Sequence, residues 1–308
     1  MLVVITGGTG GAKLIEGLAA EMDPAQLTVI CNTGDDSVFH GLYVAPDIDT
    51  ITYTLAGLND GEKGWGIQGD TFTVLEQLRR LGNDAWFNLG DKDFATHITR
   101  TRLMAEGLTL SQVTERIRAA LGVKATILPM SNERVETRVV TPEGEISFQE
   151  FFVKERWSRA VKAVHFAGAE RCEPAPGVLN AIRQSTAVVI APSNPITSIG
   201  PILAVSDIRK ALRYSVVTVV GVSPIIGGAA ISGPAHKLMA AQGLEPTAFG
   251  VADGYRDLLN RFVIDSEDRG LRGRIESLGI RVVETSIRMT SLSDKRRLAR
   301  EVLALIEK

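Results

Sequence analysis

Runs of mainly apolar residues alternate along the chain with segments of helical periodicity. Short apolar runs rich in β-branched residues predict buried strands of a parallel sheet; they lie at 2–5, 27–31, 86–89, 125–128, 187–190, 216–222, 262–265 and 281–284. Apolar residues spaced three and four apart predict helices near 12–19, 51–58, 71–81, 111–121, 235–240 and 293–307. Strands that alternate with helices are typical of an α/β protein with a parallel sheet.

This alternation is interrupted between about residues 135 and 176. Pro142-Glu143-Gly144 separates two strand-like runs, 138–141 and 145–148, which predicts a hairpin. We therefore expect a nucleotide-binding core formed by 1–134 and 177–308. We expect 135–176 to be a small insert or cap.

The first predicted strand runs into a glycine-rich turn. Four glycines surround Thr9 in the segment 7–11, and helix-like residues follow. Such a turn lets backbone N–H groups approach an anion at the positive end of a helix. It predicts phosphate or nucleotide binding by Gly8, Thr9 and Gly10, with Lys13 as a charge partner. The alternative is a tight strand-to-helix turn without a ligand.

Neither common nucleotide motif fits this turn. Lys13 stands where the dinucleotide fingerprint requires its third glycine, and it lies between Ala12 and Leu14 rather than in the Gly-Lys-Ser/Thr of a Walker A loop. Asn32 follows the second predicted strand, where a nicotinamide enzyme usually carries an acidic residue. Both departures count against a nicotinamide oxidoreductase.

Acidic residues also occur where predicted strands end. Asp47 and Asp49 precede a helix-like segment, and Asp91 and Asp93 follow the run at 86–89. In an extended segment, residues two apart point to the same side, so each pair suits a metal ion or a base beside a hydroxyl. We expect Asp47 and Asp49 to be catalytic, and Asp49, Asp91 and Asp93 to ligate the metal. Helix capping by Asp49 is the alternative for the first pair.

Polar and glycine-rich loops complete the predicted site. Asp35 and Asp36 leave the second strand beside Asn32, at the edge of the sheet where ligands gather. The segment 61–70 is rich in glycine and could close over a flat ligand. The further ligand-binding candidates are Asn32, Trp65, Ser193, Asn194, Thr197, Ser198, Gly227, Gly228 and Ser232.

Composition restricts the class of protein. The 308 residues carry a net charge of −2, which gives no support for a nucleic-acid surface. No apolar run approaches the length needed to span a membrane. The two cysteines, Cys31 and Cys172, fit a reducing compartment, and no basic segment precedes the first strand. We expect a cytoplasmic protein that binds small molecules.

Five blocks together resemble the 2-phospho-lactate transferase family of coenzyme F-420 biosynthesis. They are TGGTGGAKL at 6–14, PDIDT at 46–50, LGDKDFATH at 89–97, PSNPITSIGPIL at 192–203 and SPIIGGAAISGPAHKLM at 223–239. The resemblance runs essentially end to end, and the two later blocks are long and specific.

The resemblance implies a Rossmann-like fold and a transfer that depends on Mg²⁺. The donor is a guanosine diphosphate ester of 2-phospholactate, or of its phosphoenolpyruvate counterpart, and the acceptor is the deazaflavin FO. The ribityl hydroxyl of FO attacks phosphorus, and GMP leaves. By position Asp49 matches a deazaflavin contact, and Asn88 or Lys92 gives a second, although members commonly carry arginine at the latter position. The oligomeric state is left open between monomer and homodimer.

Two other functions remain open from the sequence. One is the nicotinamide oxidoreductase, which tight binding of NAD would support. The other is a non-catalytic regulator of the same superfamily that binds a nucleotide or nucleotide sugar. The paired aspartates count against the regulator, because a sensor has less need of carboxylates that bind a metal.

Overall fold

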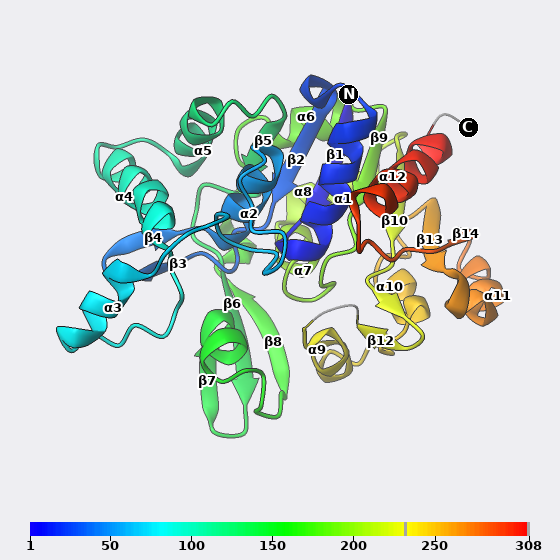
Figure 1. Cartoon of the computed structure of the whole chain (residues 1–308). Helices are drawn as coiled ribbons and strands as arrows, with labels where there is room; N and C mark the ends of the chain where they lie inside the picture. The colour runs from blue at the N-terminus through cyan, green and yellow to red at the C-terminus, as the bar shows by residue number, and fades with distance from the viewer. Residues whose placement is uncertain (231–232, 307–308) are drawn as a thin grey trace.

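A parallel sheet runs through the middle of the molecule (Figure 1). The computed structural model describes residues 1–230 and 233–306, and within them the sheet has seven strands in the order β14-β13-β10-β9-β1-β2-β5. All neighbouring strands are parallel. The strands are β1 (Leu2–Thr6), β2 (Leu27–Cys31), β5 (Thr126–Pro129), β9 (Ala187–Ile190), β10 (Thr218–Val222), β13 (Arg261–Asp265) and β14 (Arg281–Thr285). The predicted α/β class is confirmed.

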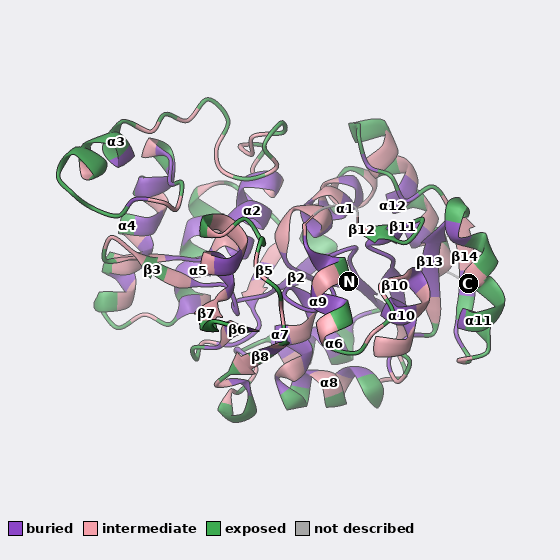
Figure 2. Cartoon of the chain, turned by 90° about the horizontal axis from the view of Figure 1, so that it is seen from below, coloured by how far each residue is buried: buried purple, intermediate pink, exposed green. Residues whose placement is uncertain are grey.

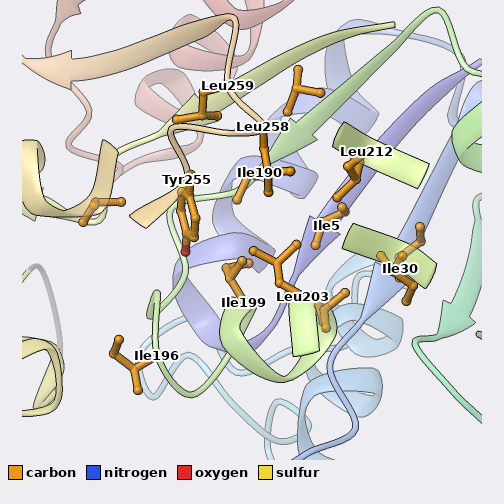
Figure 3. Packing of buried hydrophobic residues seen from close by; sticks show 14 of the residues in the cluster. Ile5, Ile30, Ile190, Ile196, Ile199, Leu203, Leu212, Tyr255, Leu258 and Leu259 are labelled. Atoms are coloured by element: carbon orange, nitrogen blue, oxygen red, sulfur yellow. The ribbon is translucent and has the colours of Figure 1, made fainter. Parts of the chain in front are cut away.

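Two apolar layers cover the sheet, because alternate side chains of a strand point to opposite faces. Leu2 and Val4 pack with α1 (Gly8–Glu21), α2 (Pro46–Leu55) and α12 (Leu292–Ile306). Val3 and Ile5 pack on the other face, part of which Figure 3 shows. The helices of that face are α6 (Val178–Gln184), α7 (Ile199–Ala204), α8 (Ser206–Arg213) and α10 (Ala248–Gly254).

The chain between β2 and β5, which are neighbours in the sheet, forms a lobe of a hairpin and helices. It consists of β3 (Ser37–Phe39), β4 (Leu42–Val44), α3 (Thr73–Arg80), α4 (Asp91–Ala105) and α5 (Leu110–Ala120). Figure 2 shows many exposed residues on α3, in contrast to the buried strands of the central sheet.

The prediction of a strand at 86–89 is wrong, because this segment has no regular secondary structure. Phe87 stacks on Phe39 with ring centroids 4.1 Å apart, and Trp86 meets Phe39 edge-on at 5.3 Å. The place beside β2 that a further strand would take belongs to β5. The apolar run therefore reflects a local aromatic cluster rather than a sheet strand.

A separate antiparallel sheet forms within residues 136–167. Its order is β7-β6-β8, from β6 (Glu136–Thr141), β7 (Gly144–Ser147) and β8 (Ala163–Ala167). The hairpin predicted around Pro142 is confirmed by the pairing of β6 with β7. In Figure 1 this sheet extends away from the central one. The cap role of 135–176 stays a prediction.

The other elements are short. They are η1 (Pro24–Gln26), η2 (Glu150–Lys154), η3 (Ala169–Arg171), β11 (Ile225–Ile226), β12 (Ala229–Ala230), α9 (Ala235–Ala241), η4 (Ser266–Leu271) and α11 (Arg272–Glu276). None of the helices in the described ranges has the length and apolar character to cross a membrane.

Candidate functional site

Three loops meet at the carboxyl edge of the sheet, where α/β proteins bind ligands. The Ser193 hydroxyl lies 3.1 Å from the Thr6 hydroxyl and accepts a hydrogen bond from the Gly7 N–H at 3.4 Å. The Asn32 amide donates to the carbonyl of Thr197 at 3.2 Å. The loops that follow β1, β2 and β9 therefore form one hydrogen-bonded unit.

The glycine turn packs too closely for side chains and leaves the start of α1 open. A Cβ on Gly10 would lie 2.4 Å from the Pro192 carbonyl oxygen, and one on Gly7 2.4 Å from Asp47 Oδ2. Gly8 has φ +67°, which glycine adopts without strain. The N-cap residue Gly7 has no side chain to cap α1, and the Gly8 N–H is bound by Asp47, so the N–H groups of Thr9 and Gly10 are the ones left for an anion.

Asp47 connects this turn to the loop after β2. Its carboxylate accepts hydrogen bonds from the Gly8 N–H at 2.7 Å and from the Asn32 amide at 2.9 Å. Burial raises the pKa of Asp47 to about 6, against the effect of these two hydrogen bonds. The carboxylate thus fixes the turn that is proposed to hold phosphate.

The expectation that Asp47 and Asp49 lie in an extended segment is wrong. The helix α2 begins at Pro46, so both residues lie in its first turn, where side chains two apart diverge. Asp47 points to the glycine turn, whereas Asp49 forms a bidentate ion pair with Arg100. The helix cap is Ala45, so Asp49 is not the capping residue.

The Asp49–Arg100 pair lies in a buried polar cluster between α2 and α4. Arg100 is fully buried, and its guanidinium also lies 3.3 Å from His97 Nδ1. His97 Nε2 lies 3.8 Å from Asp93, which accepts a 2.7 Å hydrogen bond from the Tyr53 hydroxyl. Burial lowers the pKa of His97 to about 4, so the ring is neutral at pH 7. Burial and the Asp49 charge raise the pKa of Asp93 to about 6.

The three carboxylates predicted to ligate a metal have different partners. Asp49 is paired with Arg100, Asp93 with Tyr53, and Asp91 accepts hydrogen bonds at the start of α3, including one from the Val74 N–H at 2.9 Å. Across residues 1–230 and 233–306, no group of three or more His, Cys, Asp and Glu side chains is arranged to hold a metal ion.

Asp35 and Asp36 are acidic residues at this edge whose carboxylates are only partly satisfied. Both are buried, and within the described chain the Oδ1 atom of each has no hydrogen-bond partner. Tyr43 donates to the other oxygen of Asp36 at 3.0 Å. Burial raises the pKa of both carboxyls well above the ordinary value. Sequence reasoning placed them at the edge but did not select them; their position directly after β2 was the available signal.

The loop with Trp65 lies between the glycine turn and α4. A Cβ on Gly64 would lie 3.4 Å from the Thr9 side chain, and one on Gly66 4.0 Å from Asp93 Oδ2. Trp65 is 36% exposed. Lys92 donates to the Gln68 carbonyl at 2.9 Å, so this side chain holds the loop to α4.

The remaining candidates divide into those near the glycine turn and those away from it. Ser198 faces the glycine turn, since a Cβ on Gly7 would lie 2.8 Å from the Ser198 Cβ. Asn194 shapes its own loop, because its side-chain oxygen accepts a hydrogen bond from the Ile196 N–H at 3.0 Å. Lys13 lies half-buried on α1, and Asn88 is exposed. Gly227 and Gly228 are also exposed, and Ser232 lies outside the described residues.

A parallel sheet with a glycine turn and buried carboxylates at its carboxyl edge defines a Rossmann-like α/β protein, and that edge is its candidate ligand site. The family model for the 2-phospho-L-lactate transferase CofD matches residues 2–288, and the chain belongs to this family.

Curated relatives align over nearly the whole chain. A phosphoenolpyruvate transferase of Streptomyces griseus is 46% identical over 312 residues, which cover 99% of this chain and 98% of the relative. A 2-phospho-L-lactate transferase of Methanothermobacter thermautotrophicus is 44% identical over 306 residues, with the same coverage. A solved structure, a UPF0052 family protein of Bacillus halodurans, has a TM-score of 0.65 at 16% identity and covers 98% of both chains. That structure supports the fold alone.

Proposed function

We propose that this protein transfers a 2-phospholactyl or phosphoenolpyruvyl group from a guanosine diphosphate ester to the ribityl hydroxyl of FO. The hydroxyl oxygen attacks the phosphorus that bears the three-carbon acid, and the bond from that phosphorus to the bridging oxygen breaks. GMP leaves, and coenzyme F-420-0 or its dehydro form results. Family membership and the names of the relatives support the transferred group.

The observation that carries this proposal is the meeting of two kinds of group at one edge. The start of α1 offers the N–H groups of Thr9 and Gly10 to phosphate oxygens, and Asp35 and Asp36, in the loop after the neighbouring strand β2, each offer an unpartnered carboxylate oxygen. Transfer at phosphorus requires the donor to be held and its charge to be balanced. The described site has no need of a side-chain nucleophile, because the attacking oxygen belongs to the acceptor.

Asp35 and Asp36 fit a magnesium ion better than the three aspartates first selected. Mg²⁺ is usually held by one or two carboxylates together with substrate phosphates, which agrees with the unpartnered oxygens of Asp35 and Asp36. When bound, the ion supplies charge neutralisation for the diphosphate. The residues of the chain hold the phosphates and the acceptor in place.

The acceptor is assigned to the side of Trp65 and α4. Asp49, the residue matched to a deazaflavin contact, lies in the buried cluster with Arg100 and Asp93. The loop with Trp65 covers the space between Thr9 and Asp93, and Lys92 fixes its position. These contacts support FO there. The free thiols of Cys31 and Cys172 agree with a cytoplasmic location, which is part of the proposal.

Incubation of the protein with FO, Mg²⁺ and each guanosine diphosphate ester tests the proposal. We expect one FO-derived product and one GMP for each turnover, and the donor that gives the higher kcat/KM identifies the transferred group. Binding of a nucleotide sugar without turnover would indicate the regulator, and tight binding of NAD would indicate the oxidoreductase.

A further inference from the structure

Three aromatic rings form a continuous stack in the insert. Phe148 stacks on Phe152 with centroids 5.3 Å apart and planes inclined by 22°. Phe152 stacks on Trp157 at 5.2 Å and 25°. Exposure increases along the stack, from 7% at Phe148 to 39% at Trp157. The last ring is therefore the one available to a further aromatic group.

The turn that presents Trp157 is strained. Arg156 and Trp157 have φ angles of +47° and +44°, the left-handed region that residues with side chains rarely adopt. Two consecutive strained residues persist only where surrounding contacts determine them, and such residues gather at ligand sites. A tryptophan that only covered apolar surface would not require a strained backbone, so the strain at Trp157 indicates a role in binding a ligand.

Contacts from the core hold this turn in place. Lys237, on α9, donates to the carbonyls of Trp157 at 2.7 Å and Arg159 at 3.1 Å. A Cβ on Gly233 would lie 3.3 Å from the Phe152 ring. Figure 1 shows α9 beside β8, which agrees with the contacts between them. The stack therefore adjoins the end of the glycine-rich loop that follows β10.

The same segment reaches the lobe between β2 and β5. Lys154 forms an ion pair with Asp84 at 3.2 Å, and its ammonium lies 5.6 Å from the Trp86 ring centroid. At the base of the insert, the Thr137 N–H donates to the Gly34 carbonyl at 2.7 Å. The insert therefore contacts the loop after β2 through Thr137, the lobe through Lys154, and Gly233 through Phe152.

We propose that the open face of Trp157 stacks on the flat heteroaromatic ring of a substrate. The proposal rests on the proposed function, in which both substrates carry such a ring: guanine in the donor and the deazaflavin in the acceptor. Stacking on an aromatic side chain requires only a π-face and tolerates either ring. Lys237 acts as a positioning residue, because its ammonium holds the backbone carbonyl of Trp157.

Separate binding measurements with GDP and with FO test this stack. Trp157→Leu keeps an apolar side chain and removes the ring, so we expect about 5- to 100-fold weaker binding of one of the two ligands, the factor of a lost stacking partner. Trp157→Phe should restore most of the affinity. Tyr214→Leu removes an aromatic residue that is 76% exposed at the end of α8, and it should bind both ligands as the wild type does.

The pattern of losses identifies the ring. Weaker binding of GDP alone places guanine on Trp157, and weaker binding of FO alone places the deazaflavin there. Lys237→Met should weaken the same ligand by a smaller factor and leave the other unchanged. Wild-type affinity of Trp157→Leu for both ligands, at an unchanged melting temperature, overturns the stack. If the wild-type protein binds neither ligand and shows no transfer, the proposed function itself fails.

Discussion

At the scale of single residues, the buried pair of Asp49 and Arg100 determines how an activity loss can be interpreted. Asp49→Asn removes the partner of a fully buried guanidinium. Breaking such a pair costs about 3–5 kcal/mol, because the remaining charge stays buried and uncompensated. We therefore expect this substitution to lower the free energy of unfolding by about that amount, measured by urea denaturation at pH 7.

Asp35→Asn is the matched control for this prediction. Asp35 is equally buried, but it has no cationic partner in the described chain and its pKa is raised by burial. Its neutralisation should not lower stability. Unfolding of Asp49→Asn at the urea concentration of the wild type would show that the ion pair contributes little, and a loss of turnover could then be assigned to chemistry.

Asp93 provides a pH-dependent prediction of stability. Its pKa rises from an unfolded value near 4 to about 6 in the folded protein, because of burial and of the Asp49 charge. Between these values the folded state retains a proton that the unfolded state loses, so stability falls as the pH rises and the penalty is complete above about pH 6. Asp93→Asn avoids this penalty and keeps an oxygen that can accept from Tyr53.

We expect Asp93→Asn to be more stable than the wild type by up to about 3 kcal/mol at pH 8, the equivalent of two pKa units, and by only about 1 kcal/mol at pH 4.5, where most of the penalty has not yet developed. Urea unfolding of both proteins at the two pH values measures this difference. A stability gain of equal size at both pH values would contradict the titration, because a packing effect does not depend on the charge of this carboxyl.

At the scale of secondary structure elements, the strained turn at Arg156 allows a test of backbone energetics. Arg156 is exposed, and its left-handed conformation costs about 1–2 kcal/mol for a residue with a side chain. Arg156→Gly removes that cost but raises the entropy of the unfolded chain by a comparable amount. We expect an unchanged or slightly higher melting temperature.

An exposed helical position gives the opposite result and serves as the control. Arg116 lies on the solvent side of α5, where glycine should cost about 1 kcal/mol. Thermal unfolding of both variants compares the two backbones directly. Equal destabilisation by the two substitutions would show that the turn at Arg156 is not strained in solution.

The elements also show what the sequence can specify. Continuous β-branched runs such as the one in β1 are buried on both faces, so local composition was enough to predict the central strands. The run at 86–89 has the same apolar character, but its rings pack on Phe39, and only the tertiary structure decides between these outcomes. The first turn of α2 was missed because Pro46 suits both an extended segment and a helix start.

The candidate site was predictable to the extent that it follows the strand ends. The glycine turn, Asn32 and Ser193 meet because β1, β2 and β9 are neighbours in the sheet. The partner of Asp49 could not be foreseen, because Arg100 lies 51 residues away on a helix outside the sheet. The unpartnered oxygens of Asp35 and Asp36 could not be predicted either, because the lack of a hydrogen-bond donor near them follows from the tertiary packing.

At the scale of the whole molecule, the site connects loops from both sides of β1, so a ligand that joins them should stabilise the entire fold. A ligand that binds only the folded state adds about 2.7 kcal/mol at a concentration of 100 Kd. We expect GDP with Mg²⁺ to raise the melting temperature by several degrees, with a smaller rise from GDP alone. Addition of EDTA to the ternary mixture should reduce the rise to that of GDP alone.

Substitutions of acidic residues can separate the part of the melting-temperature rise that comes from GDP from the part that comes from Mg²⁺. If Asp35 and Asp36 hold the ion, Asp35→Asn should remove most of the rise that Mg²⁺ adds and leave the rise from GDP alone, because the N–H groups of α1 still bind phosphate. Asp91→Asn is the control, since Asp91 is engaged at the start of α3. A full magnesium effect in Asp35→Asn, together with its loss in Asp91→Asn, would return the metal to the aspartates of α4.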